Sequence, residues 1–193
     1  MTDIPLINPL ADESGMRLRP VEAAHAPGIF ALVDADRERL SRRLPWVQSC
    51  RTPSDTVGFV ADSVLRRNRD EGGDGSGDWA IEVPQEAGPT VVGVIGLHDT
   101  RLSQHRTAIG YWISSTFAER GYATRAARLV TTHCLDRGLH RIEINVAIDN
   151  HPSRAIAERL GFALEGVARC AEWIDGRAID HAVYALVRPT PDE

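Results

Sequence analysis

The chain has 193 residues, a length that suits one domain with a core large enough to need no disulfide or metal. Hydrophobic residues make up 42% of the chain and charged residues 25%, which is the balance of an ordinary globular protein. The formal net charge of −5 argues against nucleic acid as the partner and is compatible with a cationic or amine-bearing substrate.

The cysteines and the chain ends indicate a compartment. Cys50, Cys134 and Cys170 have the spacing of neither a disulfide framework nor a metal site, so we expect reduced thiols in a cytosol and no bound metal. The first residues lack the pattern of a signal peptide, and no apolar stretch approaches the ~20 residues that cross a bilayer. The sequence therefore predicts a soluble cytoplasmic protein without a membrane partner.

The first half of the chain predicts helices followed by a meander of strands. We expect residues 1–14 to be a polar leader without fixed structure and residues 15–188 to form one domain, with 189–193 as a tail. Thr52 starts a helix, because its hydroxyl can cap a first turn that contains Pro53 and Asp55. The other predicted elements are a strand at 16–20, a helix at 25–34 that extends to 40, a glycine-rich loop at 71–77, and strands at 78–83, 90–97 and 107–113.

The second half of the chain alternates helices and strands. Small and apolar residues recur at helical spacing in 121–137, and residues alternate in polarity through 141–147. A helix is predicted at 150–160, and two last strands at 163–173 and 179–187. A meander followed by alternating elements favours an α/β fold with a mixed sheet flanked by helices.

A strand-to-helix turn after IGYWI carries the strongest chemical signal. The following helix begins GYATRAARLV, so small residues leave its first N–H groups open to an anion, aided by the helix dipole. Gly121 lets a phosphate approach the backbone and Ala123 keeps the next turn unobstructed. Arg120 and Arg125 can add positive charge. Many such turns bind nothing, so the pattern alone leaves both interpretations open.

A second strand-to-helix turn, DNHPSRAIAERLGF, lies about 30 residues further along. Asn150 and Ser153 are one helical turn apart at its start. Asn150 can simply cap the helix, with Ser153 as an ordinary first-turn residue. Two such turns on neighbouring strands also suit the two walls of one ligand site.

These segments together resemble a known family. The run from 109 to 162, with IGYWIS, ERGYATRAARLV and IDNHPSRAIAERLGF, is similar to the GNAT superfamily of acetyl-CoA-dependent acetyltransferases, and most similar to its RimJ/RimL branch. The resemblance extends back through LPW and VVGVIGLHD and forward through EGVARCAEWIDGRAIDHAVYALV, so it covers almost the whole chain. It implies a mostly antiparallel sheet of about seven strands with about four helices, and an N-acetyltransferase whose co-substrate is acetyl-CoA.

The resemblance also assigns the coenzyme contacts. The family's phosphate motif falls on residues 118–123, where both small positions match but Ala118 replaces the usual Gln or Arg. Because backbone N–H groups make most of these contacts, the substitution should weaken binding without abolishing it. The implied coenzyme-binding residues are Trp112, Ile113, Ser114, Glu119, Arg120, Gly121, Tyr122, Ala123, Thr124, Asn150 and Ser153.

The mechanism that the resemblance implies is direct attack of an amine on the thioester. A base must first take the amine's proton, and the resemblance gives this role to Glu172 and the protonation of the leaving thiolate to Ser153. It places the oxyanion donor at backbone N–H near Ile113. Glu172 could instead be an ordinary surface residue of an edge strand. Branch members often carry Glu at the place of Ala108, which concentrates the base role on Glu172.

Other polar residues are reserve candidates on the acceptor side. His98 and Asp99 end a central strand and could contact substrate, although a lone histidine there is more often structural. Glu143 could contribute through a water molecule. Trp46 follows an arginine-rich helix that the resemblance places over the acceptor groove, and packing of Trp46 on the core is an equal alternative.

The acceptor is the least determined part of the prediction. The RimJ/RimL resemblance favours the α-amine of a protein or peptide, such as a ribosomal-protein N-terminus, and implies either a homodimer or a monomer. The alternatives are a small-molecule amine, such as an aminoglycoside, a polyamine or an aminoacyl nucleotide, and a non-catalytic acyl-CoA-binding module. The replacements at Ala108 and Ala118 are the support for the non-catalytic alternative.

Overall fold

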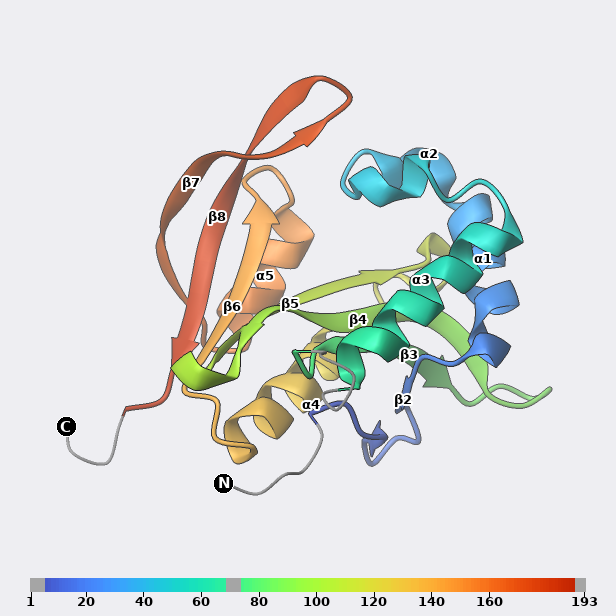
Figure 1. Cartoon of the computed structure of the whole chain (residues 1–193), viewed down its shortest axis with the longest axis horizontal. Helices are drawn as coiled ribbons and strands as arrows, with labels where there is room; N and C mark the ends of the chain where they lie inside the picture. The colour runs from blue at the N-terminus through green and yellow to red at the C-terminus, as the bar shows by residue number, and fades with distance from the viewer. Residues whose placement is uncertain (1–5, 69–73, 190–193) are drawn as a thin grey trace.

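The structure is a computed structural model that describes residues 6–68 and 74–189. An eight-stranded sheet runs through it, with helices on both faces (Figure 1). The strands are β1 (Leu10–Ala11), β2 (Arg17–Pro20), β3 (Gly77–Val83), β4 (Thr90–Arg101), β5 (Arg106–Ile113), β6 (Arg141–Ala147), β7 (Ala163–Ile174) and β8 (Arg177–Val187). The helices are η1 (Ala23–His25), α1 (Ala26–Ala35), α2 (Arg37–Ser41), η2 (Pro45–Gln48), α3 (Pro53–Arg67), η4 (Leu102–Gln104), η5 (Ser115–Phe117), α4 (Tyr122–Asp136) and α5 (His151–Arg159).

The sheet order is β1-β2-β3-β4-β5-β6-β8-β7, and every pair except β5 with β6 is antiparallel. The β5–β6 pair is parallel because α4 carries the chain back across the sheet between the two strands. This mixed, mostly antiparallel sheet with four main helices confirms the predicted fold class. The eighth strand is the two-residue β1, which pairs with β2 through Leu10 and Leu18.

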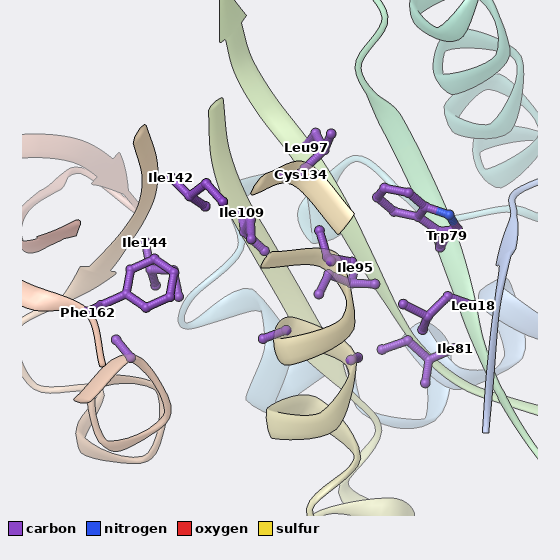
Figure 2. Close-up of a cluster of buried hydrophobic side chains, with 14 of the residues drawn as sticks. Leu18, Trp79, Ile81, Ile95, Leu97, Ile109, Cys134, Ile142, Ile144 and Phe162 are labelled. Carbon is purple, nitrogen blue, oxygen red and sulfur yellow. The ribbon is translucent and has the colours of Figure 1, made fainter. Parts of the chain in front are cut away.

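The sheet separates two hydrophobic clusters. On one face, α4 and α5 pack small and apolar side chains against the central strands, and Figure 2 shows this cluster from Leu18 to Phe162. On the other face, α1 and α3 cover β3 and β4 with a smaller cluster around Ile29, Val33 and Val60. Ala127, Val130 and Cys134 on α4 are fully buried, as the predicted small-residue stripe requires.

Several element boundaries follow from local chemistry. The β6 strand has the predicted bounds, and α3 begins after a capping box in which Thr52 and Asp55 each bind the other's backbone N–H. The helical character predicted as far as residue 40 is present, but it is interrupted at Asp36, so the chain forms α1 and α2 rather than one helix. The side chain of Asp36 is committed instead to Ser115 beyond β5.

The leader is also more structured than predicted. Leu6 and Ile7 are buried in the larger cluster, and Asp12 receives hydrogen bonds from the backbone of Ser14 and Met16. The apolar residues of the leader therefore complete the core beside Met16, whereas residues 1–5 lie outside the described part of the chain. The predicted glycine-rich loop lies partly outside it, and Gly77 begins β3.

Candidate active site

The centre of the sheet opens between β5 and β6. The two strands pair only where Arg106, Thr107 and Ala108 meet Arg141, Ile142 and Glu143; beyond these residues they diverge, as Figure 1 shows. The hydroxyl of Tyr111 bridges the gap to the Ser153 carbonyl oxygen at 3.4 Å. Burial raises the pKa of Tyr111 to about 12, so this hydroxyl remains a neutral donor. Because β5 and β6 are parallel, α4 and α5 both begin at the open end of the gap.

The turn before α4 has the backbone geometry of an anion site. Glu119 and Gly121 adopt left-handed conformations, with φ of +59° and +76°, whereas Arg120 between them does not. Alternation of this kind turns N–H groups toward one side, and no side chain caps α4 at Gly121. A Cβ added at Gly121 would meet no heavy atom within 4 Å, so open space lies beside this backbone. The turn can accept a pyrophosphate.

Three arginines near this turn differ in what their side chains contact. Arg120 is exposed, and its guanidinium lies over the Phe117 ring, 5.5 Å from the centroid. The guanidinium of Arg125 lies over the Tyr122 ring, 5.4 Å from the centroid, and its Nε donates to Asp12 at 2.7 Å, so its charge is paired with a carboxylate. Arg159 at the end of α5 supplies a charge that the sequence analysis missed, because its Nη1 donates to the Thr124 hydroxyl at 3.4 Å.

The end of β5 is fixed from both sides. The Ser114 N–H donates to the carbonyl oxygen of Val92 on β4 at 2.9 Å. Ser114 is buried, and its N–H is therefore already paired. Arg39 Nη2 donates to the carbonyl oxygen of Ile113 at 2.6 Å. Burial would raise the pKa of Asp36, but hydrogen bonds from Arg39 and Ser115 outweigh it and lower the pKa to about 2. Asp36 therefore joins α2 to the strand end as a carboxylate.

The start of α5 presents the second pair of predicted residues. The Asn150 side chain accepts a hydrogen bond from Ser153 N at 3.4 Å and caps the helix, as the structural interpretation predicted. Ser153 is half-buried, and among the described residues no partner is recorded for its hydroxyl. Capping by Asn150 orients this first turn, so the Ser153 hydroxyl is free to contact a ligand.

Glu172 lies two strands away from β6, at the same end of the sheet as Ser153. Ala147, the last residue of β6, pairs with His181 in β8, and Glu172 in β7 reaches His181 with 3.4 Å between Oε2 and Nε2. The Glu172 side chain is one-third exposed, so it can be reached by a substrate. Glu172 therefore has a specific partner, which no sequence pattern indicated because the pairing depends on strand register.

The remaining acidic and histidine candidates lie toward the closed end of the gap. His98 pairs with Ala108 and is exposed, and its ring covers Gly110, where an added Cβ would lie 2.9 Å from Nε2. Asp99 is also exposed and left-handed, with φ of +47°. Glu143 is held by Arg141 at 2.6 Å and Arg106 at 3.8 Å, so it is an ion-pair partner of both, and its role through water stays a prediction.

The segment from α2 to η2 forms a wall beside the opening, and we call residues 37–50 the wall. Its Trp46 stacks on Phe59 and lies 6.2 Å from the Trp112 ring, centroid to centroid, while remaining 41% exposed. Trp46 therefore packs on its neighbours and keeps an exposed surface, and a substrate contact at Trp46 stays a prediction. The Trp112 ring belongs to the cluster on this same face, so its side chain points away from α4.

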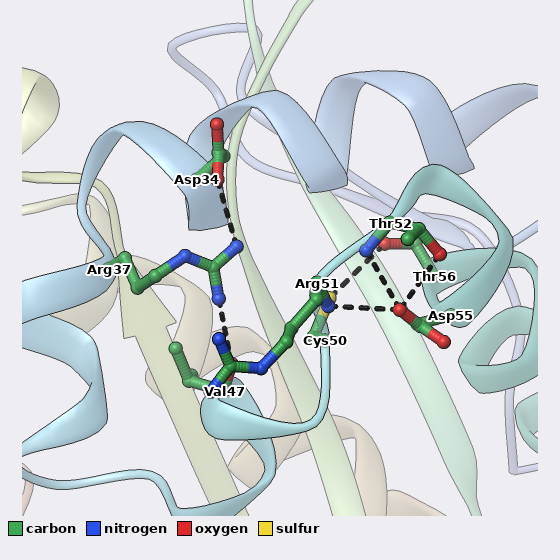
Figure 3. A network of polar contacts seen from close by, with 8 residues as sticks. All are labelled: Asp34, Arg37, Val47, Cys50, Arg51, Thr52, Asp55 and Thr56. Carbon is green, nitrogen blue, oxygen red and sulfur yellow. Dashed lines mark hydrogen bonds and ion pairs between the residues drawn. The ribbon is translucent and has the colours of Figure 1, made fainter.

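Polar contacts fix the wall at both ends. Figure 3 shows Arg37 joining Asp34 to the Val47 carbonyl oxygen, each at 2.9 Å. Further along, Arg43 contacts Asp149 before α5, and Gln48 contacts Asp175 in the β7–β8 turn. The wall therefore reaches the start of α5 and the hairpin that carries Glu172.

The described part of the chain contains neither a candidate metal site nor a membrane-spanning helix. No three His, Cys, Asp or Glu side chains gather there in an arrangement that could hold a metal ion. No helix within residues 6–68 or 74–189 is long and apolar enough to span a bilayer.

Comparison with known proteins matches this architecture to one family. The family profile for the acetyltransferase (GNAT) domain matches residues 16–163. The YdaF protein of Bacillus subtilis (strain 168) is 28% identical over 172 residues, covering 89% of this chain and 90% of the relative. The ribosomal-protein-serine acetyltransferase of Escherichia coli (strain K12) is 25% identical over 173 residues, covering 89% of this chain and 92% of the relative.

A solved structure extends the likeness to three dimensions. RimL, the ribosomal L7/L12 alpha-N-protein acetyltransferase in complex with coenzyme A, superposes with a TM-score of 0.84 at 24% identity, covering 93% of this chain and 98% of that one. The likeness to RimL shows a shared fold. The family match spans the gap between β5 and β6 and both helix starts. The chain therefore belongs to the GNAT family and is an acetyl-CoA-dependent N-acetyltransferase.

Proposed function

We propose that this protein acetylates the α-amine at the N-terminus of a protein or peptide. The observation that carries the proposal is the opening between β5 and β6, with two helix starts on one side and the partly exposed Glu172 carboxylate on the hairpin beside it. The relatives support the acceptor class, because the one from E. coli is named for a ribosomal-protein serine and RimL for the α-amine of L7/L12.

The coenzyme half of the mechanism rests on backbone groups. The N–H groups from Arg120 to Ala123 bind the pyrophosphate, and the left-handed Gly121 keeps the space beside them open. Arg120 and Arg159 add charge that Ala118 does not supply. Asn150 and Ser153 line the pantetheine and thiol end, where acetyl-CoA supplies the acetyl group as a thioester.

The acceptor half needs a base and an acid. An amine is mostly protonated at neutral pH, so Glu172 removes a proton before the amine nitrogen attacks the acetyl carbonyl carbon. The Ser153 hydroxyl, for which the described residues offer no other partner, gives a proton to the departing thiolate. The exposed Trp46 lies beside the incoming acceptor.

A transfer assay with labelled acetyl-CoA tests the function. The acceptors are synthetic peptides that begin with Ser or Ala, with the same peptides formylated at the N-terminus as matched controls, and the polyamine spermidine and an aminoglycoside as competing classes. Label on the free peptides alone is the expected result. Label on spermidine or the aminoglycoside alone would assign a small-molecule acetyltransferase, and binding of acetyl-CoA without transfer to any amine would assign a non-catalytic module.

A further inference from the structure

We propose that His181 receives the acceptor's proton through Glu172, so that the two residues act as one proton-accepting pair. This inference rests on the proposed function and names a positioning residue for the same site. His181 Nε2 lies 3.4 Å from Glu172 Oε2, and the two side chains are 17% and 33% exposed. The pair is therefore shielded by the hairpin and still open to substrate.

A bulge in β7 creates this pair. Ala168 pairs with His181, and regular antiparallel pairing from that point would place residue 172 opposite residue 177. The register instead shifts between Ala168 and Glu172, so that Glu172 pairs with Ile179. Glu172 therefore lies two positions closer to His181 than regular pairing would place it. The two residues are diagonal neighbours, and long side chains in such positions on one sheet face can touch.

The bulge is held in place by a specific contact. Three residues of β7, from 169 to 171, lie opposite the single residue Asp180 of β8. Cys170, the middle residue, adopts a left-handed conformation with φ of +53°, and its N–H donates to Asp180 Oδ1 at 2.8 Å. A non-glycine residue in this conformation costs free energy, which the local contact offsets. Bulges of this kind commonly re-aim a side chain near an active site.

A carboxylate and an imidazole differ in basicity, and this difference explains how the pair works. An ordinary carboxylate accepts a proton only in acid, whereas an imidazole does so near neutral pH. A carboxylate alone is therefore a weak base for an ammonium group, and a neighbouring imidazole is the better final acceptor. Among the described residues no side chain pairs with Nδ1 of His181, and the ring is 17% exposed, so a proton taken up at Nε2 can be balanced by release from Nδ1 to water.

The step balances in atoms and charge. One proton passes from the acceptor's ammonium group to Glu172 and on to His181, and then from His181 to water. The C–N bond forms as the amine attacks the thioester carbon and the C–S bond breaks. The second proton of the amine nitrogen ends on the thiol through Ser153. The net result is one amide, one free thiol and one proton released to solvent.

The test separates basicity from mere orientation. His181→Gln keeps a hydrogen-bonding side chain beside Glu172 but cannot accept a proton near neutral pH. We expect kcat for a Ser-initial peptide to fall about 30-fold, less than the ~10²-fold expected for a group that takes the proton directly, because Glu172 remains in place, with KM values unchanged. His140→Gln, at the opposite end of β6, is the matched control and should keep the wild-type kcat. In His181→Gly, added imidazole should restore much of the lost kcat.

The possible outcomes test the role of His181, the proposed function and the folding of the variants separately. Wild-type kcat in His181→Gln, or no rescue of His181→Gly by imidazole, overturns the role of His181 while leaving the proposed function intact. Failure of the wild-type protein to acetylate any peptide overturns the proposed function, and the inference with it. Circular dichroism and acetyl-CoA affinity equal to wild type in both variants exclude loss of folding as the cause.

Discussion

The two sides of the opening between β5 and β6 differ in the groups that they present, backbone N–H groups on one side and exposed side chains on the other. On the coenzyme side, α4 and α5 pack a fully buried face on the sheet and offer backbone N–H groups at their starts. On the acceptor side, the wall of residues 37–50 and the β7–β8 hairpin are largely exposed and joined by single contacts, such as Gln48 with Asp175. Backbone groups on packed helices suit a constant coenzyme, whereas exposed side chains on a wall can vary with the acceptor.

The largest expected effect is loss of coenzyme binding in Gly121→Val. The left-handed conformation at Gly121 costs a β-branched residue about 1–2 kcal/mol, and the new side chain enters the open space beside the phosphate turn. Calorimetry should then detect no acetyl-CoA binding. Gly138→Val, at the other end of α4, is the matched control because Gly138 has φ of +84° and equally open surroundings. Equal affinities in the two variants would remove the phosphate site from this turn.

A second prediction concerns turnover on the acceptor side. Glu172→Gln should lower kcat by about 10²-fold, because the group that removes the amine's proton is lost, and should leave acetyl-CoA affinity unchanged. Glu165→Gln on the same strand is the control, since Glu165 pairs with Arg141 and not with His181. A kcat within twofold of wild type in Glu172→Gln would mean that the acceptor side contributes no base here.

The contribution of the contact between Asp36 and Ser115 to stability should depend on pH. The hydrogen bonds from Arg39 and Ser115 hold the pKa of Asp36 at about 2, below the ordinary 3.8. A lowered folded-state pKa stabilises the fold above the ordinary value, and this stabilisation is lost as pH falls from about 4 toward 2. Asp36→Asn should therefore lower the free energy of unfolding by about 2 kcal/mol at pH 7, and the difference should shrink in acid.

Urea unfolding at several pH values measures the Asp36 effect. Asp34→Asn is the control, because Asp34 pairs with Arg37 on the surface and such pairs contribute little. A constant difference between Asp36→Asn and wild type across this pH range would show that the carboxylate charge does not join α2 to β5.

The smallest expected effect is at the edge of the wall. Gln48→Ala removes an exposed contact with Asp175 and should raise the KM for a peptide acceptor about threefold, with the KM for acetyl-CoA unchanged. Gln85→Ala, in the turn between β3 and β4, is the matched control. A change in the acetyl-CoA KM of Gln48→Ala instead would mean that the two sides are not separable.

The sequence by itself determined most of the elements and the turn before α4. Local signals are sufficient there: a capping box starts α3, alternation defines β6, and Gly121 marks a turn that needs a left-handed residue. These features depend on residues close together in the chain, so one sequence carries them. The family profile spans the turn before α4 and the start of α5.

Only the tertiary structure decided how the acceptor side is assembled. Asp36 separates α1 from α2, and its carboxylate binds Ser115, 79 residues away. His181 meets Glu172 because a bulge shifts the register of β7 against β8. Arg125 at the start of α4 pairs with Asp12, which belongs to a leader whose apolar residues complete the core. Each of these contacts joins distant segments, and their pairing follows from packing and strand register, which local sequence patterns do not encode.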